Sequence, residues 1–325
     1  MKKITSKVVT AGIAASMVMS VGMMTAAEDQ TYNVGVCQLV QHPALDAATQ
    51  GFRDVLTEKL GDQVNIDVQN ASGDSATCAT IVNQFVSGES DLIMANATPA
   101  LLAAVAGTNE IPILGTSISV YSVALDIPDE EWTGTTGMNV SGTSDLAPLD
   151  EQAAMFAELL PDAKTVGLLY CSAEPNSVYQ VDAVEAVLKE AGVETKVYTF
   201  ADSNDIASIV TQAAGEVDAM YVPTDNTAAS NAEIINNICE PAGIPIICGE
   251  EGLCAGCGIA TLSIDYYDLG CKTGEMAYEV LVNGADVSTM PIEFAPQFVK
   301  KYDAARCEAL GIEIPDDYAA IETEE

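Results

Sequence analysis

TVGLLYCSAEPNS, residues 165–177, combines a short apolar strand with a turn of small and polar residues that opens a helix. The same order recurs in three other stretches, at residues 64–75, 91–99 and 219–227. Turns of this kind lie at the carboxyl ends of parallel strands, where open α/β sheets bind their ligands. They offer hydroxyls, amides, carboxylates and the free N–H groups of helix N-termini. The repetition therefore predicts two halves that close on a small polar molecule.

The alternation of strands and helices predicts an α/β protein of two Rossmann-like lobes with parallel central sheets, joined by a three-strand hinge. In the first half, the expected strands cover 32–40, 64–68, 92–95 and 111–114, and the expected helices cover 43–60, 74–87 and 98–106. In the second half, the expected strands cover 165–170, 194–200, 219–222 and 245–248, and the expected helices cover 177–191, 205–214 and 227–242.

A Gly/Ser/Thr stretch at 141–145 follows an expected strand at 134–140 and marks the first crossing between the lobes. We expect Asp145 to cap a helix that reaches Leu160. A strand at 258–263 then leads back to the first lobe. The resulting division is a signal peptide at 1–27, an N-terminal lobe of 31–141 plus 264–289, and a C-terminal lobe of 142–263 plus 290–325.

The chain is strongly acidic. Its 325 residues include 12 lysines and arginines against 48 aspartates and glutamates, which gives a formal net charge of −36. Such a surface repels nucleic acid and anionic lipid headgroups, so we expect no nucleic-acid partner. The acidic residues are best explained as a solvated surface that keeps the protein in solution.

The first 27 residues have the pattern of a secretory signal. Lys2, Lys3 and Lys7 precede an apolar run at 8–24, and small residues follow at 25–27. A membrane anchor is the alternative, although the run is short for a span and rich in glycine, serine and alanine. We therefore expect an exported protein, periplasmic or at the cell surface or outside it, with no further membrane span.

The chain contains nine cysteines. Most lie inside apolar segments, as Cys37, Cys171 and Cys248 do, where a small buried hydrophobe is the expected role. Cys254 and Cys257 have the C-x-x-C spacing of redox and metal sites. Their spacing to other thiols is irregular and the stretch opens no evident helix, so we expect no metal and no cofactor. A thiol- or metal-dependent enzyme that uses this pair remains an alternative.

Signatures of catalysis are missing from the predicted strand ends. No Gly-x-Ser-x-Gly elbow, Walker loop or Gly-x-Gly-x-x-Gly fingerprint follows a strand. The single histidine, His42, leaves one candidate base for a catalytic triad. We therefore expect no catalytic residues, and we interpret His42 either as a donor in a cleft or as a helix-start residue.

The polar residues at the predicted strand ends combine into one candidate ligand site. They are Ser72, Asp74, Thr98, Thr116 and Ser117 in the first lobe, and Glu174, Asn176, Ser177, Asp225, Asn226 and Glu250 in the second. These turns contain no lysine or arginine, which a phosphate or dicarboxylate ligand would usually recruit. A zwitterion needs none, because hydroxyls and helix N–H groups can hold its carboxylate while Asp225 or Glu174 holds its ammonium group. For each residue taken singly, helix capping is the alternative.

Six stretches in series carry a resemblance to a known family. They are GVCQLVQHPALD (35–46), NASGD (70–74), ATP (97–99), SAEPNS (172–177), PTDN (223–226) and DYYDLG (265–270). At these residues the chain resembles the type I ABC transporter substrate-binding proteins, and more closely their tryptophan/tyrosine-type branch. The resemblance implies two lobes, a three-strand hinge and an amino-acid-like ligand that is passed to an ABC permease in the membrane.

The matching positions would place Thr98, Ser117, Asn176, Asp225 and Asn226 around the ligand. Gram-positive members of the family usually carry a lipobox cysteine at the signal cleavage point, and this chain has none there. We therefore expect a monomeric, non-enzymatic solute receptor of an ABC importer that binds an amino acid, aromatic by the resemblance. A ligand-sensing receptor domain of the same fold is the other alternative.

Overall fold

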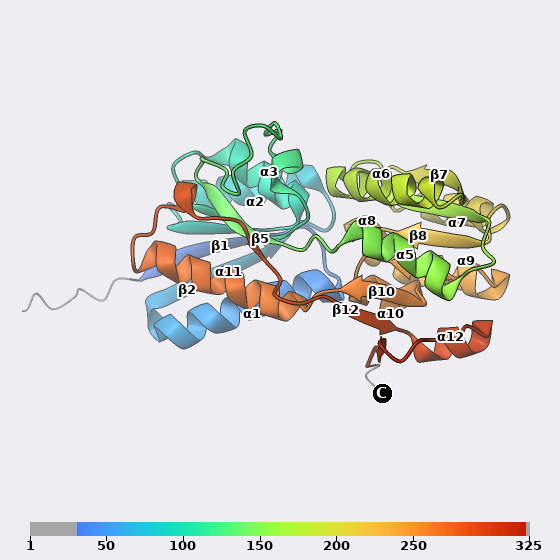
Figure 1. Ribbon diagram of the computed structural model, residues 1–325. Coiled ribbons are helices and arrows are strands. Elements are labelled where there is room, and N and C mark those ends of the chain that lie inside the picture. Colours follow the sequence, from blue (N-terminus) through green and yellow to red (C-terminus); the bar gives the residue numbers. More distant parts are fainter. Residues whose placement is uncertain (1–30, 323–325) are drawn as a thin grey trace, which may run out of the picture. The chain divides into compact units, whose positions relative to one another are not determined.

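The computed structural model describes residues 31–322, and the predicted signal peptide lies outside them. Within this range, no helix combines the length and the apolar character that a membrane crossing requires. Two separate sheets organise the described chain, and helices cover each of them (Figure 1).

A six-stranded sheet is the centre of the first lobe, with the strand order β11-β5-β4-β3-β1-β2 and only parallel pairings. Its strands are β1 (Tyr32–Gln38), β2 (Val64–Asn70), β3 (Leu92–Asn96), β4 (Ile113–Ile118), β5 (Val140–Ser144) and β11 (Glu293–Phe294). Its helices are α1 (Pro43–Leu60), α2 (Ser75–Ser87), α3 (Thr98–Gly107), α4 (Tyr121–Ala124) and α11 (Tyr266–Leu281).

A seven-stranded sheet is the centre of the second lobe, with the order β13-β12-β10-β9-β8-β6-β7. Only the pairing of β10 with β12 is antiparallel. The strands are β6 (Thr165–Cys171), β7 (Glu194–Phe200), β8 (Ala219–Val222), β9 (Ile246–Cys248), β10 (Ala260–Ser263), β12 (Val299–Tyr302) and β13 (Ala319–Ala320). The helices are α5 (Leu149–Leu159), α6 (Pro175–Glu190), α7 (Ile206–Ala214), α8 (Asn226–Ala229), α9 (Ala232–Ala242), α10 (Glu251–Cys257) and α12 (Ala304–Leu310).

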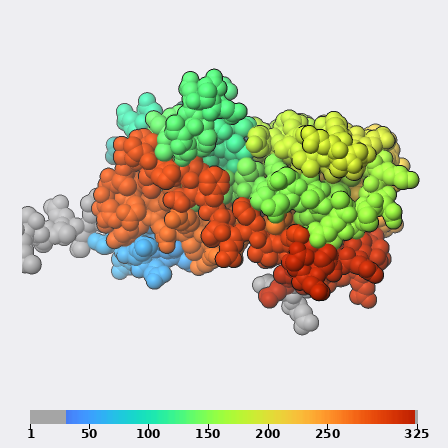
Figure 2. Space-filling model, in the orientation of Figure 1, coloured from blue at the N-terminus to red at the C-terminus, as the bar shows by residue number. Residues whose placement is uncertain are grey.

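The chain passes between the two sheets three times. It leaves the first sheet after Ser144, returns after Ser263 and leaves again after Phe294. Figure 2 shows the red-orange part of the chain, which carries the third passage, on the surface where the two lobes meet. The α/β fold with two parallel-dominated sheets agrees with the prediction. The first and third passages lie a few residues later than expected, because β5 and β11 both belong to the first sheet.

Helices α1 and α11 pack with their backbones in close approach. A Cβ atom added at Gly51 of α1 would overlap the carbonyl oxygen of Tyr267, and one added at Gly270 of α11 would overlap that of Ala48. Glycine at these positions therefore lets α11 lie directly on α1. Because α11 follows the second passage, this packing anchors the returning chain to the first lobe.

The strands alternate their side chains between two apolar layers, as the period of a strand requires. In β1, Val36 packs with Phe52 of α1 on one face. Cys37 packs with Val82 of α2 and Leu101 of α3 on the other face. Both faces of the first sheet are therefore buried, which is usual for parallel sheets.

Three local predictions were wrong. The segment 134–140 is not a strand, and the structure begins β5 only at its last residue. The expected helix at 227–242 is two helices, because the side chain of Asn231 donates to the carbonyl of Thr227 at 2.8 Å between them. Asp145 caps no helix, since α5 begins at Leu149 with Pro148 in the N-cap position.

Candidate functional site

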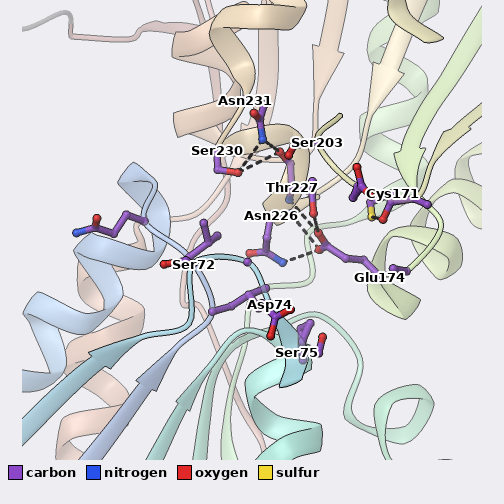
Figure 3. A pocket seen from close by; sticks show the side chains of 18 of the residues that line it. Ser72, Asp74, Ser75, Cys171, Glu174, Ser203, Asn226, Thr227, Ser230 and Asn231 are labelled. Carbon is purple, nitrogen blue, oxygen red and sulfur yellow. Dashed lines mark hydrogen bonds between the residues drawn. The ribbon is translucent and has the colours of Figure 1, made fainter. Parts of the chain in front are cut away.

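A pocket of about 560 Å³ is lined by turns from both sheets. Ser72 and Asp74, after β2, form its first-lobe wall, and Glu174, Asn226 and Thr227 belong to its second-lobe wall. Figure 3 shows these side chains around the pocket. None of the residues that line it is a lysine or an arginine. The pocket is therefore polar and acidic, and it lies at the strand ends where open α/β sheets bind ligands.

The first-lobe turns have backbone conformations that side chains rarely adopt. Ser72, Ala97 and Ser117 follow or end β2, β3 and β4, with φ angles of 53°, 84° and 56°. A positive φ costs free energy for any residue but glycine, and such outliers are enriched at ligand sites. Each of these three strands therefore has a non-glycine residue with a positive φ at or near its carboxyl end.

Glu174 holds the start of α8 in place. One of its carboxylate oxygens accepts the N–H of Asn226 at 3.0 Å and the amide Nδ2 of the same residue at 2.7 Å. The other accepts the N–H and the hydroxyl of Thr227 at 2.8 and 2.7 Å. These donors all come from the second lobe (Figure 3). The carboxylate therefore caps a helix and orients the side chain of Asn226.

Two further carboxylates also accept backbone N–H groups of their own lobe. Asp225 accepts the N–H of Ala228 at 2.8 Å and the N–H of Cys171 at 2.7 Å. Glu250 accepts the N–H groups of Gly252 and Leu253 at the start of α10. Burial raises the pKa of Asp225 to about 8, helped by the nearby charge of Glu174, and burial raises the pKa of Glu250 to about 7.

His42 connects the two lobes. Its Nε2 lies 3.2 Å from Oδ1 of Asn226, and its Nδ1 is buried without a partner. Because Glu174 takes the amide NH₂ of Asn226, the amide oxygen faces His42, so Nε2 carries the proton. Burial lowers the pKa of His42, against a smaller rise caused by Asn226, Glu174 and Asp46.

A second set of polar contacts connects the lobes near the passages. Gln180 of α6 donates from Nε2 to the hydroxyl of Ser119 at 3.2 Å, and its Oε1 accepts the N–H of Thr224 at 3.1 Å. The hydroxyl of Tyr266, at the start of α11, donates to Asp145 Oδ2 at 3.0 Å. The Gln180–Ser119 and Tyr266–Asp145 hydrogen bonds are buried. Together with the His42–Asn226 contact, they join the strand ends of the two sheets.

The structure places the eleven predicted residues in two groups. Ser72, Asp74, Glu174 and Asn226 line the pocket. Thr98, Thr116, Ser117, Asn176, Ser177, Asp225 and Glu250 are buried and do not line it.

Several predicted residues have clear local contacts. Asp74 caps α2 through the N–H of Thr77. Thr116 is bonded inside the first lobe, 3.1 Å from the hydroxyl of Thr143. Asp225 and Glu174, one of which was expected to hold the ammonium group, each accept protein donors on both carboxylate oxygens.

Three polar residues of this region were not predicted. Gln180, Asp145 and Gln152 are all nearly fully buried, and Gln152 donates to the carbonyls of Gly249 and Leu262 at 3.1 and 3.0 Å. For Gln180 a signal existed, since it lies one helical turn after Asn176 and so shares its face.

The C-x-x-C stretch is helical, contrary to expectation. Cys254 is the middle residue of α10 and Cys257 its last, and both are buried together with Cys248 and Cys239 in one apolar cluster. Burial raises the pKa of Cys254. Among the described residues, no group of three or more histidine, cysteine or acidic side chains is placed to hold a metal ion.

These features define a class of protein: two α/β lobes, three passages between them, and a polar pocket lined by the strand ends of both. The sequence profile described as "ABC transporter substrate binding protein" matches residues 33–324, and the chain belongs to that family.

Individual relatives agree with this assignment. The chain is 38% identical over 263 residues to the tyrosine-binding protein of Clostridioides difficile (strain R20291), which covers 80% of this chain and 75% of that protein. It is 33% identical to an ABC domain from Streptococcus pneumoniae solved in complex with L-Trp, with a TM-score of 0.83 over 88% of this chain and 97% of that one. It is 36% identical to a ligand-free, open substrate binding protein with adhesive properties from Clostridium difficile, with a TM-score of 0.67 over 90% and 100% of the two chains.

Proposed function

We propose that this protein is the extracytoplasmic receptor of an ABC importer and that it binds an aromatic amino acid, tyrosine or tryptophan, between its lobes. The observation that carries the proposal is the polar pocket without cationic residues, at the strand ends of both sheets, in a chain of this family. A tyrosine-binding relative and a relative crystallised with L-Trp support the choice of ligand. The predicted export signal and an ABC permease as partner belong to this proposal, as does a monomeric receptor.

Ligand binding is coupled to closure of the lobes. The described arrangement has a TM-score of 0.83 with the L-Trp complex but 0.67 with the open, ligand-free relative. This difference supports the view that the lobes are described in a closed arrangement. His42 and Gln180 each reach a residue of the other lobe, and these contacts form only when the lobes meet. A ligand that binds both walls shifts the receptor towards that state.

The ligand site that we propose comprises the eleven predicted residues, of which some contact the ligand and others hold those residues in place. Ser72 and Asp74 present side chains to the pocket. Glu174 and Asp225 act through the backbone, because they fix the start of α8 and thereby the side chain of Asn226. A zwitterion suits this set, since its carboxylate can accept hydroxyls and N–H groups without a cationic partner.

A thermal-shift screen of the purified protein tests the function. The twenty amino acids are compared with sugars, nucleosides and oligopeptides at equal concentration. A ligand present at 100 times its dissociation constant adds about 2.7 kcal/mol to the free energy of unfolding, so binding is readily detected. Tyrosine or tryptophan should produce the largest shift. A shift produced only by a sugar or a nucleoside would refute the ligand class.

A further inference from the structure

Three buried carboxylates at the strand ends already receive donors from the protein itself. Glu174, Asp225 and Glu250 each accept two backbone N–H groups. Carboxylates used in this way cap helices, and their best acceptor positions are taken. The ammonium group of an amino acid therefore needs acceptors elsewhere between the lobes.

Asp145 is a buried carboxylate with an oxygen that nothing in the protein uses. It follows β5 at the first passage between the lobes, and only 4% of it is exposed. Its Oδ2 accepts the hydroxyl of Tyr266 at 3.0 Å, from the start of α11. Its Oδ1 is buried and has no hydrogen-bond partner. A buried acceptor without a partner is costly, so such an atom in a ligand-binding protein points to the ligand.

Short contacts connect Asp145 with both walls of the cleft. Ser119 follows β4, and its hydroxyl accepts the amide of Gln180 from the second lobe at 3.2 Å. The N–H of Asp145 donates to the carbonyl of Ile118, the residue before Ser119, at 3.3 Å. Gln180 accepts the N–H of Thr224 at the end of β8. It also donates to the carbonyl of Asn176 at 3.2 Å. Asp145 therefore lies where the strand ends of the two lobes meet.

Two more polar atoms of this region are buried without partners. Asn176 donates its amide NH₂ to the carbonyl of Thr224 at 2.9 Å, which leaves its Oδ1 as an acceptor with no donor. The hydroxyl of Ser117 is likewise unpartnered. Asn176 and Ser117 are each 6% exposed. Asp145, Asn176 and Ser117 lie behind the residues that line the 560 Å³ pocket, and the amide nitrogen of Asn176 is 3.4 Å from Oε2 of the pocket residue Glu174. Two acceptors and a hydroxyl of this buried layer are thus left for a ligand.

We propose that Asp145 receives the ammonium group of the amino acid ligand and that Oδ1 of Asn176 is its second acceptor. The inference rests on the proposed function and identifies the part of the ligand that these residues bind. Among the described residues, no lysine or arginine forms an ion pair with Asp145. A buried carboxylate is destabilising without a countercharge, and the ligand supplies one.

The titration of Asp145 agrees with this role. Burial raises its pKa, against the lowering effect of the nearby Ser119 hydroxyl and of the hydrogen bond from Tyr266. The titratable groups that face it are Tyr121, Tyr266 and Glu250, and none of them is cationic. An ammonium group beside Asp145 lowers that pKa, so binding releases a proton wherever the free protein carries one. Affinity for the amino acid therefore falls as the pH drops through the pKa of Asp145 in the free protein.

The test compares L-tyrosine with its deaminated analogue, 3-(4-hydroxyphenyl)propionate, by calorimetric titration of the wild type, Asp145→Asn and Asp303→Asn. Asp303 is the matched control, because it is 6% exposed but pairs with Arg306 at the start of α12. Asp145→Asn should weaken tyrosine binding about 10- to 100-fold and change analogue binding less than about threefold. Asp303→Asn should change neither. If the screen favours tryptophan, indole-3-propionate serves as the analogue.

The outcomes separate this inference from the proposed function. Equal losses for both ligands in Asp145→Asn overturn the inference, whereas failure of the wild type to bind any amino acid overturns the function. If Asp145→Asn does not fold, titration of the wild type in buffers of different ionisation enthalpy decides the question. Tyrosine should then release protons at acidic pH and the analogue should not, and equal release by both ligands refutes the role of Asp145.

Discussion

The polar turns of the two lobes have different local structures. All five non-glycine residues with positive φ in the described chain lie in the first lobe, and Ser72, Ala97 and Ser117 are at strand ends. In the second lobe, the corresponding turns keep ordinary backbone angles. They place the buried carboxylates Glu174 and Asp225 on the N–H groups of α8 instead.

This difference explains how an acidic protein can form a polar ligand site without lysine or arginine side chains. In the second lobe, Glu174 and Asp225 are satisfied by backbone N–H groups and need no cationic side chain. In the first lobe, strain in the backbone positions hydroxyls such as that of Ser117, which has no partner in the protein. The first lobe therefore offers side chains to a ligand, whereas the second lobe uses its acidic groups mainly to hold its own helices. Each prediction below tests one side of this comparison.

The largest effect is expected for Glu174→Ala. This change removes the acceptor of the backbone N–H groups of Asn226 and Thr227, and an unsatisfied buried donor costs about 1–3 kcal/mol. We expect the free energy of unfolding to fall by about 3 kcal/mol and the affinity for the amino acid to fall at least about tenfold. Chemical denaturation and calorimetry measure the two quantities. Glu190→Ala, at the exposed end of α6, is the control, and similar effects in both variants contradict the helix-capping role.

Glu250 predicts a pH dependence of stability. Its pKa rises from 4.5 to about 7 on burial in the folded protein. The folded state therefore holds this proton more tightly than the unfolded state, and the stability it contributes below pH 4.5 is lost as the pH rises through 7. The loss is roughly 3 kcal/mol. Glu250→Gln cannot ionise, so its stability relative to the wild type should increase between pH 5 and 8. Chemical denaturation of the wild type and Glu250→Gln without ligand, at pH 5 and at pH 8, measures this change. A stability difference between the two proteins that is the same at both pH values contradicts the raised pKa of Glu250.

Asp225 and Asp205 provide a matched pair at two helix starts of the second lobe. Asp225 accepts two backbone N–H groups, whereas Asp205 precedes α7 without a side-chain hydrogen bond to it. We expect Asp225→Ala to destabilise the protein by about 2 kcal/mol and Asp205→Ala by less than about 0.5 kcal/mol. Affinity should fall with Asp225→Ala alone, because the start of α8 carries Asn226. Equal small changes in melting temperature and affinity would remove Asp225 from the site.

Much of the fold could be predicted because its signals are local. Apolar periodicity, Pro43 at the start and Gly61 at the end predict α1 with the bounds that the structure has. The bounds of β7 and β8 were also predicted correctly. The wrong predictions occur where side-chain hydrogen bonds to the backbone compete with regular secondary structure. Hydrophobic periodicity does not detect such bonds. The hydroxyl of Thr136 donates to the carbonyl of Val140, which closes a turn where a strand was expected.

The site could be predicted only in part. Residues at strand ends, such as Asp74 and Asn226, were found because topology brings strand ends together. The roles of Asp145, Gln152 and Gln180 depend on contacts with residues far away in the sequence, and a single sequence does not reveal them. The hydrogen-bond partners of Asp225 and Glu174 were not predicted for the same reason. Asp225, after β8, accepts an N–H group from the end of β6, and Glu174, after β6, accepts N–H groups from the turn after β8.

The first-lobe side of the comparison is tested by Ser72→Gly. Ser72 and Glu89 both have positive φ, of 53° and 52°, and both are exposed, but only Ser72 lines the pocket. Replacement by glycine relieves a backbone cost of about 1 kcal/mol in each case. Ser72→Gly and the control Glu89→Gly should therefore each gain about that much stability in denaturation experiments. Only Ser72→Gly should lower the affinity for the amino acid. Destabilisation by both changes would show that neither turn is strained.

The smallest effect on binding is expected for the cysteines of α10, which lie behind the cleft rather than in it. Cys254 and Cys257 are 0% and 4% exposed in the apolar cluster of the second lobe, and neither lines the pocket. Cys254 is the middle residue of α10 and Cys257 its last, and Glu250 already accepts the N–H groups of Gly252 and Leu253 that would lower a thiol pKa in a redox motif. The double replacement by serine should destabilise the protein, because buried hydroxyls lack ready partners there. The dissociation constant should nevertheless stay within about threefold of the wild type, a difference below roughly 0.7 kcal/mol. Cys271→Ser, at a less buried thiol on α11, is the control for calorimetry. A stoichiometric metal in the purified protein, or loss of binding in a folded double variant, would show that these thiols serve the site itself.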